Sequence, residues 1–238
     1  METYLEQQIN KYQSLPYEPN IAIFMMGIPG SGKSTSCRNF VENALGLILS
    51  SSYIINQQYD YTLDNFILCN PDEVVKSHPD YTPDNSINNL HLSSKLNNKL
   101  LKTILNEEKT YNFIYDATGK QYGNYLKKIR HAQDRHYYTI LVDVRTDVLT
   151  CYQRVIFRDR HVALNVISKI EEDIYTPKHY PNKYNHQYEG LNNYDILSDI
   201  VDLSLVIDNN NETGFIKEIY SHEENIEDEL SDFININI

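Results

Sequence analysis

The chain has 238 residues, a formal net charge of -12 and a hydrophobic share of 41%. This length and composition predict a soluble globular protein with one sizeable core. The acidic balance argues against a long nucleic-acid partner, because contacts to phosphates need a basic surface. The cysteines Cys37, Cys69 and Cys151 stand far apart without metal or disulfide spacing, so we expect a reducing, cytoplasmic setting. The chain shows neither a signal-peptide pattern nor an apolar run of membrane-spanning length, and we expect no membrane association.

The N-terminal segment carries apolar residues at helical spacing, namely Leu5, Ile9 and Tyr12. This spacing predicts an amphipathic helix, which two following prolines would end. We therefore expect residues 1–19 to form a helix that packs on the core of a larger domain, residues 20–208.

A short apolar strand, Ile21–Met26, precedes the strongest motif in the chain. The motif matches G-x-x-x-x-G-K-[ST], the phosphate-binding loop. Its glycines let successive backbone amides point at a phosphate, and the helix that begins here adds its positive dipole end. Lys33 is placed to reach the outer phosphates, and the Ser34 hydroxyl to bind Mg²⁺. The expected nucleotide-binding residues are Gly27, Pro29, Gly30, Ser31, Gly32, Lys33, Ser34 and Thr35.

The region after the motif is difficult to assign beyond its first helix, which we expect to run from Lys33 to Leu45. Gly46–Leu49 is compatible with a helix end or a short strand, and three serines interrupt it. The polar, tyrosine-rich residues that follow favour a surface insertion over residues 46–65.

Two further strands are predicted to end in polar residues. Phe66–Cys69 is the first, and Asp72 then begins a helix. Ligands of parallel α/β folds bind at the carboxyl ends of strands, so Asp72 is either a carboxylate beside the nucleotide or a simple helix cap. A long helix with one buried face is expected to end near Glu107.

The second of these strands, Tyr111–Tyr115, leads into a segment rich in candidate ligands. Asp116 and Thr118 are candidates for Mg²⁺ or substrate contacts, and Lys120 is a further substrate candidate. The alternative is an ordinary strand-to-helix turn, in which Asp, Thr and Gly are common.

A basic helix over residues 122–135 and a fourth strand over residues 138–144 follow. Either Thr146 or Asp147 is expected to cap the next helix. The residues expected to face inward on that helix are Val148, Leu149, Tyr152, Val155 and Ile156.

Three arginines stand close together at the end of this helix, at Arg154, Arg158 and Arg160. Arginines on a lid commonly neutralise the charge that develops on a transferred phosphoryl group. We expect a lid over about residues 154–175, with surface salt bridges as the alternative interpretation.

The C-terminal part is predicted to hold the last strand, Val201–Asp208, and then a turn of three asparagines. Residues 209–238 are expected to form an acidic, solvated tail. The alternation of strands and helices predicts an α/β fold of the P-loop kinase type, in which helices flank a mostly parallel twisted sheet and an arginine-bearing lid covers the site.

In this order, the motifs resemble the zeta-toxin family of small-molecule kinases. The matching pieces are the phosphate loop, Asn70–Val74 with the His-Pro-Asp that follows, the strand end at Asp116–Gly119, and the Arg-Asp-Arg-His-Val sequence at residues 158–162. The resemblance spans roughly residues 20–208. Where the family often has Glu-Gly-Thr, this chain has Asp-Ala-Thr.

The resemblance implies an ATP- and Mg²⁺-dependent kinase in which Asp72 is the catalytic base. It places Ser34 on Mg²⁺, and Thr118 and Asp116 on the substrate. The implied catalytic residues are Asp72, Lys33, Arg154, Arg158 and Arg160.

The acceptor implied by the resemblance is a hydroxyl group of a small molecule, with UDP-amino-sugars as the example from bacterial toxins of the family. The resemblance also implies that a small antitoxin-like protein can block the nucleotide site. Two alternatives stay open: a polynucleotide 5′-hydroxyl or nucleoside kinase, and a nucleotide-binding module without phosphotransfer.

Overall fold

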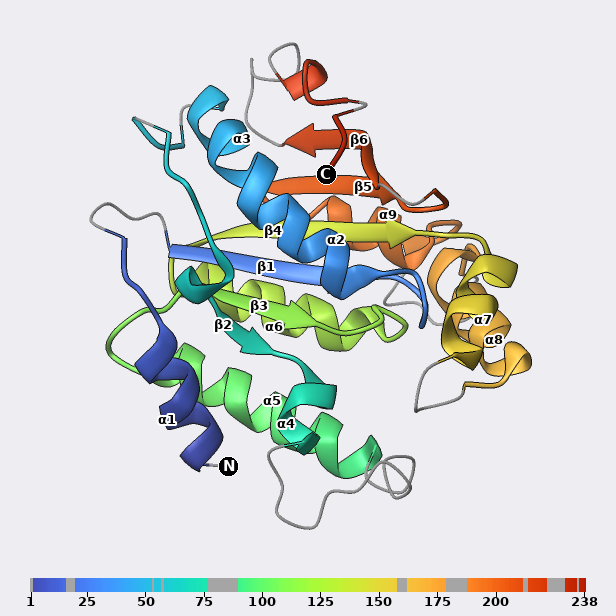
Figure 1. Cartoon of the computed structure of the whole chain (residues 1–238), viewed down its shortest axis with the longest axis horizontal. Coiled ribbons are helices and arrows are strands. Elements are labelled where there is room, and N and C mark those ends of the chain that lie inside the picture. Colours follow the sequence, from blue (N-terminus) through green and yellow to red (C-terminus); the bar gives the residue numbers. More distant parts are fainter. Residues whose placement is uncertain are drawn as a thin grey trace.

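The computed structural model describes residues 2–15, 20–52, 54–56, 58–76, 90–157, 162–178, 188–211, 214–221, 230–234 and 236–238. One six-stranded sheet lies at the centre, and helices cover both of its faces (Figure 1). The predicted α/β architecture with a mostly parallel sheet is confirmed.

The strands follow the order β2-β3-β1-β4-β5-β6 across the sheet. All neighbouring pairs are parallel except β5 and β6, which are antiparallel. Their bounds are Asn20–Met26 (β1), Ile67–Cys69 (β2), Phe113–Asp116 (β3), Tyr137–Arg145 (β4), Leu203–Asp208 (β5) and Phe215–Ser221 (β6). Because β1 to β5 run in the same direction, the segments that follow β1, β2 and β3 meet at the side of the sheet formed by the carboxyl ends of these strands.

The helices connect these strands and supply the covering layers. Their bounds are Glu2–Lys11 (α1), Lys33–Phe40 (α2), Gly46–Ser51 (α3), Pro71–Lys76 (α4), Leu90–Asn106 (α5), Tyr122–Asp134 (α6), Val148–Ile156 (α7), Leu164–Tyr175 (α8) and Asn193–Ser198 (α9). A π-helical turn, η1 (Val41–Leu45), joins α2 to α3, and a 3-10 turn, η2 (Leu63–Asn65), precedes β2. No helix in the described part of the chain is long and apolar enough to cross a membrane.

Side chains of β1 alternate between two apolar cores, one on each face of the sheet. On one face, Ile23 packs in a cluster with Phe40 of α2. On the other, Phe24 packs in a cluster with Ile129 of α6 and Leu197 of α9. This two-sided burial explains why the strand before the phosphate loop is apolar throughout rather than alternating.

The predicted N-terminal helix is confirmed as α1, and it covers the open edge of the sheet at β2. The Tyr4 hydroxyl donates a hydrogen bond to the Leu68 carbonyl at 3.1 Å. Tyr4 itself is buried, and Leu5 and Ile9 pack against the core. The helix therefore occupies an edge that would otherwise present unpaired backbone groups.

Residues 46–65 differ from the predicted surface insertion. Gly46–Ser51 continues the preceding helix as α3, with Ile48 and Leu49 fully buried. The segment that follows returns across this helix and packs directly on its backbone. The approach is so close that a Cβ on Gly46 would lie 1.9 Å from the Tyr59 carbonyl oxygen. Tyr61 is buried in the same core. Apolar residues at helical spacing therefore outweighed the break that the serines suggested.

The C-terminal part also differs from the prediction. Residues 209–238 do not form only a solvated tail, because β6 adds a further strand beside β5. Leu230, Phe233 and Ile238 are buried against the sheet. The acidic stretch that was expected to be solvated lies mostly outside the described residues.

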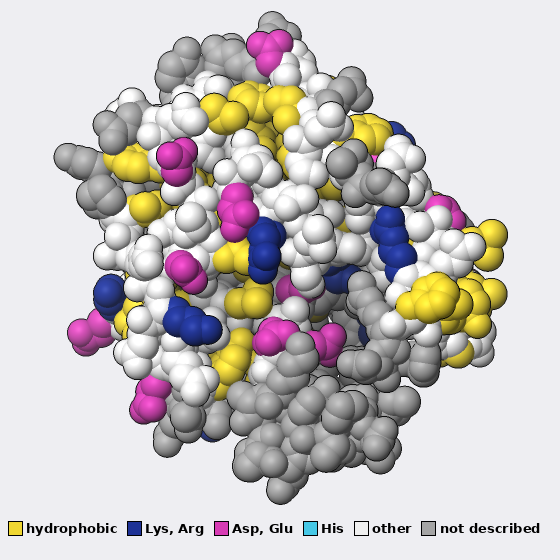
Figure 2. Space-filling model, in the orientation of Figure 1, with side chains coloured by type: hydrophobic (Ala, Val, Ile, Leu, Met, Phe, Trp, Pro, Cys, Tyr) yellow, Lys and Arg dark blue, Asp and Glu magenta, His cyan; other side chains and the backbone are white. Residues whose placement is uncertain are grey.

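Helix α7 begins as expected, with the Asp147 side chain accepting a hydrogen bond from the Thr150 amide at 2.8 Å. Its predicted inward face is only partly correct. Val155 is buried, but Leu149 is 65% exposed and Ile156 is 37% exposed. Together with Phe157, which is 86% exposed, they lie on the outer surface around α7, the part of the molecule where Figure 2 shows yellow side chains on the right.

Candidate active site around the phosphate loop

The phosphate loop follows β1 and is shaped by three glycines with positive φ. These angles are 134° at Gly27, 90° at Gly30 and 88° at Gly32. The loop is also packed too closely for a side chain at these positions. A Cβ on Gly27 would lie 2.5 Å from the Val144 carbonyl oxygen, and one on Gly30 would lie 2.4 Å from the Cys151 carbonyl oxygen. The three glycines are therefore required by both backbone conformation and space.

Lys33 begins helix α2 and lies across the loop. Its Nζ atom donates hydrogen bonds to the carbonyl oxygens of Gly27 at 3.0 Å and of Ile28 at 3.2 Å. The ammonium group therefore lies at the concave side of the loop, at the positive end of a helix. Ser31 is fully buried within the loop, whereas Ser34 and Thr35 are exposed on the first turn of the helix. This arrangement suits the terminal phosphates of a nucleotide.

Asp116 lies at the end of β3, beside the first turn of α2. The Ser34 hydroxyl donates a hydrogen bond to its Oδ2 atom at 3.3 Å. The Asn70 side-chain amide, which follows β2, donates a second bond to the same oxygen at 2.9 Å. The structure therefore brings together the two predicted metal ligands, Ser34 and Asp116, from segments 82 residues apart.

The Asp116 carboxyl is 8% exposed, and its burial is the largest influence on its pKa, which is raised above the ordinary value of 3.8. The charge of Lys33 and the hydrogen bond from Ser34 lower this pKa in part. The nearby charge of Asp72 raises it further. Lys33 and Asp72 thus act on the pKa of Asp116 in opposite directions.

Asp72 lies in the first turn of α4, directly after β2. Its backbone amide donates a hydrogen bond to the Asn70 side-chain oxygen at 2.8 Å, and Asn70 in turn contacts Asp116. The Asp72 residue is exposed. The structure therefore places Asp72 near Asp116, in an exposed helical turn directly after β2.

Arg154 lies in the last turn of α7, on the opposite side of the phosphate loop. Its Nη2 atom donates a hydrogen bond to the Asn209 carbonyl oxygen at 2.9 Å. Its Nη1 atom would lie 3.7 Å from a Cβ on Gly32. The predicted proximity of Arg154 to the nucleotide site is thus supported by geometry, whereas Arg158 and Arg160 lie outside the described residues.

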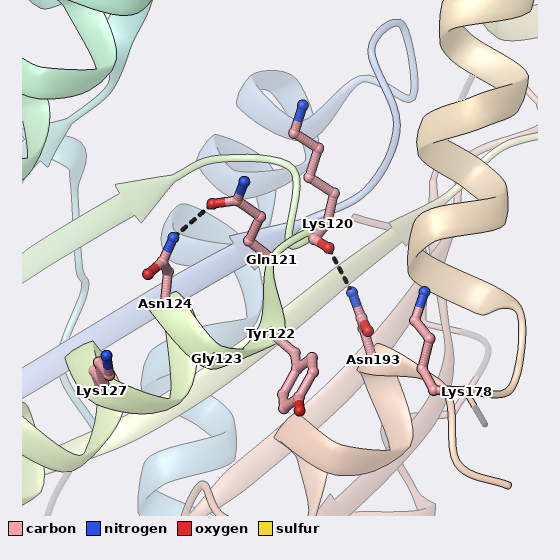
Figure 3. Close-up of a pocket in the computed structure, with 8 residues that line it drawn as sticks. All are labelled: Lys120, Gln121, Tyr122, Gly123, Asn124, Lys127, Lys178 and Asn193. Atoms are coloured by element: carbon pink, nitrogen blue, oxygen red, sulfur yellow. Dashed lines mark hydrogen bonds between the residues drawn. The ribbon is translucent and has the colours of Figure 1, made fainter. Parts of the chain in front are cut away.

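The segment after Asp116 leads from the phosphate loop to an open pocket of about 430 Å³ (Figure 3). The Thr118 carbonyl accepts a hydrogen bond from the Gly27 amide at 3.2 Å, which ties this segment to the phosphate loop. Lys120 lines the pocket together with Lys127 and Lys178. The described residues that line it are Lys120, Gln121, Tyr122, Gly123, Asn124, Lys127, Lys178 and Asn193.

Asn193 is the fully buried member of this lining. Its side-chain amide donates hydrogen bonds to the carbonyl oxygens of Gly119 at 2.9 Å and Lys120 at 3.0 Å. Figure 3 shows its side chain between Tyr122 and Lys178, below the Lys120 backbone. Asn193 therefore fixes the end of the segment that begins at Asp116.

Four residues of this site were missed by the sequence analysis, namely Asn70, Thr146, Asn193 and Asn209. Asn70 and Asn209 each come directly after a strand of the parallel sheet, and this position was the signal that could have found them. Thr146 had been considered only as a helix cap. Asn193 had no local signal, because it reaches the site from α9, a helix that was not predicted.

The surface around the site carries both signs of charge. On the face in Figure 2, the described Lys and Arg side chains stand singly among Asp and Glu rather than in a continuous basic band.

Comparisons with known proteins agree with this geometry. A family model described as an AAA domain matches residues 23–174, which is more than half of the chain. No curated protein sequence matches the chain.

Two groups of solved structures have a similar fold. A chain from the PezAT chromosomal toxin-antitoxin system of Streptococcus pneumoniae is 15% identical, with a TM-score of 0.56, over 98% of this chain and 85% of that chain. A chain from the AvrRxo1-ORF1:-ORF2 complex with ATP is 14% identical, with a TM-score of 0.60, over 98% of this chain and 70% of that chain. The predicted zeta-toxin-like P-loop kinase fold is thus confirmed, and the chain belongs to the AAA domain family whose model spans residues 23–174, the phosphate loop included.

Proposed function

We propose that this protein is an ATP-dependent phosphotransferase that moves the γ-phosphoryl group to a hydroxyl group of a small molecule. The observation that carries the proposal is a continuous line of contacts from the phosphate loop to Asp72. Ser34 bonds to Asp116, Asp116 bonds to Asn70, and Asn70 bonds to the Asp72 backbone. A carboxylate on an exposed helical turn beside a phosphate loop is a candidate general base for phosphoryl transfer.

In the proposed reaction, the acceptor hydroxyl gives its proton to the Asp72 carboxylate while its oxygen forms a bond to the γ-phosphorus. The bond from this phosphorus to the β–γ bridging oxygen breaks, and ADP leaves. Lys33 and Arg154 stabilise the charge that spreads over the outer phosphate oxygens. Ser34 and Asp116 would hold Mg²⁺, which supplies further charge neutralisation there.

The donor set fits Mg²⁺, because the hydroxyl and the carboxylate are hard oxygen ligands at the edge of the phosphate loop. Among the described residues, no group of three or more His, Cys, Asp and Glu could hold a metal by itself. Mg²⁺ beside a nucleotide needs only one or two protein oxygens, since phosphates and water complete its shell. Arg158 and Arg160 remain proposed contributors to the same charge stabilisation.

The pocket beyond Asp116 supports an acceptor with a negatively charged part, such as the diphosphate of a UDP-amino-sugar. Three lysines line it, and none of its described lining residues is a carboxylate. In a chain with a net charge of -12, this local excess of positive charge favours an anionic ligand. Thr118 and Lys120 would then contact the acceptor between its hydroxyl and its charged part.

We expect a double substitution, Lys120→Ala with Lys127→Ala, to raise the KM for such an acceptor about tenfold, because each lysine offers a charge-assisted contact. The kcat and the KM for ATP should change less than about twofold, since no hydrogen bond or ion pair joins either lysine side chain to the phosphate loop in the described part of the chain. Steady-state kinetics with each substrate varied in turn measures this. Lys217→Ala, an exposed lysine on β6, is the matched control. An equal rise in the KM for ATP would contradict this role of the pocket.

The experiment that tests the proposed function is incubation with γ-labelled ATP and a panel of acceptors. The panel contains UDP-amino-sugars, nucleosides and oligonucleotides with a free 5′-hydroxyl. Label transfer to a nucleotide sugar supports the proposal, and transfer to an oligonucleotide or nucleoside supports the first alternative. ATP binding without transfer to any acceptor supports a binding module and overturns the enzymatic proposal.

An antitoxin-like protein inhibitor also remains a proposal. Its support is that one structural relative is described as part of a toxin-antitoxin system. Such an inhibitor would compete with ATP at the phosphate loop of this chain. The cytoplasmic setting expected from the cysteines stays a prediction.

A further inference from the structure

Asn209 lies where three parts of the site meet: the end of β5, the phosphate loop and the last turn of α7. It follows β5 directly, and its backbone amide donates a hydrogen bond to the Arg145 carbonyl at 2.9 Å. Its side-chain Nδ2 atom donates to the Ser31 carbonyl oxygen at 2.7 Å. This side chain also packs against the loop so closely that a Cβ on Gly32 would lie 2.2 Å from Nδ2. The Asn209 side chain therefore packs against the phosphate loop and also donates a hydrogen bond to it.

The backbone carbonyl oxygen of Asn209 also makes contacts, and these are on the side of α7. It accepts the hydrogen bond from Nη2 of Arg154 at 2.9 Å. The Thr146 hydroxyl lies within hydrogen-bonding distance of this oxygen, at 3.1 Å, and of the Ser31 carbonyl oxygen, at 3.0 Å. One asparagine thus contacts the loop through its side chain and the arginine through its backbone, and a buried threonine links the same two carbonyls.

The other half of the Arg154 guanidinium group has no such contact. Its Nη1 atom is buried and lacks a hydrogen-bond partner among the residues that the structure describes. Leaving a charged N–H group buried without a partner costs free energy, and protein structures rarely tolerate it. The atom lies beside Gly32, at the turn that leads into α2. A phosphate oxygen held by the loop is the partner that this position suits.

We propose that Asn209 is a positioning residue that couples the phosphate loop to Arg154, so that the arginine reaches the outermost phosphate only while the Asn209–Ser31 hydrogen bond is formed. The side-chain bond anchors the Asn209 peptide, and the anchored carbonyl holds the guanidinium group in place. This proposal rests on the proposed nucleotide site, and it concerns how the site distinguishes ATP from ADP.

The test is a double-mutant cycle of Asn209→Ala and Arg154→Ala, read out as dissociation constants for ATP and for ADP by calorimetry. We expect each single variant to weaken ATP binding about fivefold to tenfold more than ADP binding, because only ATP carries the outermost phosphate. The double variant should bind ATP no more than about twofold more weakly than Arg154→Ala alone, because the asparagine acts through the arginine. Additive losses for ATP, or equal losses for ATP and ADP, would overturn the proposal.

Two further variants separate positioning from general damage to the turn. Asn209→Asp keeps the shape but removes the Nδ2 donor, so it should lose ATP selectivity at least as strongly as Asn209→Ala, and wild-type selectivity in it would overturn the proposal. Asn210→Ala changes the neighbouring asparagine, whose side chain bonds to Asp208 and accepts a hydrogen bond from the Asp147 amide at the start of α7, with no bond to the phosphate loop among the described residues. It therefore disturbs the same turn and the start of α7 without touching the Asn209–Ser31 bond, and it should keep the wild-type ATP to ADP ratio. Loss of selectivity in this control would equally count against a specific role for Asn209.

If Asn209→Ala fails to fold, a second pair of variants tests the same coupling between the phosphate loop and Arg154. Thr146→Val removes the hydroxyl that lies between the same two carbonyls, and Thr146→Ser restores it. The valine variant should lose ATP selectivity and the serine variant should recover it. The binding measurements need no acceptor, so they are independent of the phosphotransfer assay. If the wild type transfers the phosphoryl group but the double-mutant cycle is additive, only the coupling between Asn209 and Arg154 is rejected. Failure of the wild type to bind ATP would reject the proposed function itself.

Discussion

Replacing Asp72 with asparagine is expected to lower kcat by about 10²–10⁴, the range of effects for loss of a general base. Asparagine keeps the size of the side chain but cannot accept the acceptor proton at neutral pH. The dissociation constant for ATP should change less than about threefold, since Asp72 lies on α4, outside the phosphate loop. Single-turnover transfer of label from γ-labelled ATP, with ATP binding measured in parallel, checks both parts.

Glu73→Gln is the matched control for this substitution. Glu73 is the next residue in the same helical turn, and the change removes the same charge from nearly the same place. If this variant lost activity as strongly as Asp72→Asn, the effect would be one of local charge rather than proton transfer. Full activity in Asp72→Asn would remove Asp72 from the mechanism.

Replacing Asp116 with asparagine is expected to abolish Mg²⁺-dependent transfer, with a loss of at least about 100-fold, because a metal ligand is removed beside the phosphates. The same substitution should make the folded protein more stable at neutral pH. Asp116 is 8% exposed, and its burial penalises the charged form. Asparagine keeps one side-chain oxygen that can accept the bonds from Ser34 and Asn70 while it removes the buried charge.

The pH dependence of this stability difference follows from the direction of the pKa shift. The Asp116 pKa is raised in the folded state above its ordinary value of 3.8, so the folded state binds more protons than the unfolded state between these two pKa values. The free energy of unfolding of the wild type therefore falls as pH rises through this window. The gain in Tm of Asp116→Asn over the wild type should be small near pH 3.5 and should grow to a plateau above the raised pKa, which thermal melts across pH can follow.

A double measurement on this variant distinguishes function from structure. A higher Tm with lost transfer would show that a buried carboxylate is retained for its metal-binding role at a cost in stability. A lower Tm at every pH would contradict the argument and would indicate that the ionised carboxylate stabilises the fold through Lys33. The dissociation constant of Mg²⁺-ATP, compared with that of ATP alone, tests the ligand role separately.

Local patterns account for the parts of the site that could be predicted from the sequence. The phosphate loop was predictable because glycine conformation, a lysine and a helix start are all encoded within nine consecutive residues. Asp72 and Asp116 could be placed near it because parallel strands bring their carboxyl ends to one edge, whatever lies between them in the chain. The order of motifs was sufficient for this inference, even though 82 residues separate Ser34 from Asp116.

Other features depended on contacts that no local pattern encodes. Leu149 and Ile156 have the spacing of core residues, yet they lie on the exposed side of α7. The polar residues near Tyr59 suggested a surface insertion, yet Gly46 allows this segment to pack closely across a buried helix. Periodicity describes which residues share a face, but only the neighbouring elements decide whether that face is covered.

The sequence by itself determined the phosphate loop, the mostly parallel α/β sheet and the edge at which Asp72 and Asp116 lie, because short-range conformational preferences and strand order suffice for these. Only the tertiary structure decided that β6 completes the sheet, that Asn193 closes the lysine-lined pocket and that Asn209 joins the phosphate loop to Arg154. The Asn209 side chain meets Ser31 across 178 residues of chain. The position of Asn209 directly after a strand could place it at this end of the sheet, but only the packing of the whole domain decides that Ser31 and Arg154 are its partners.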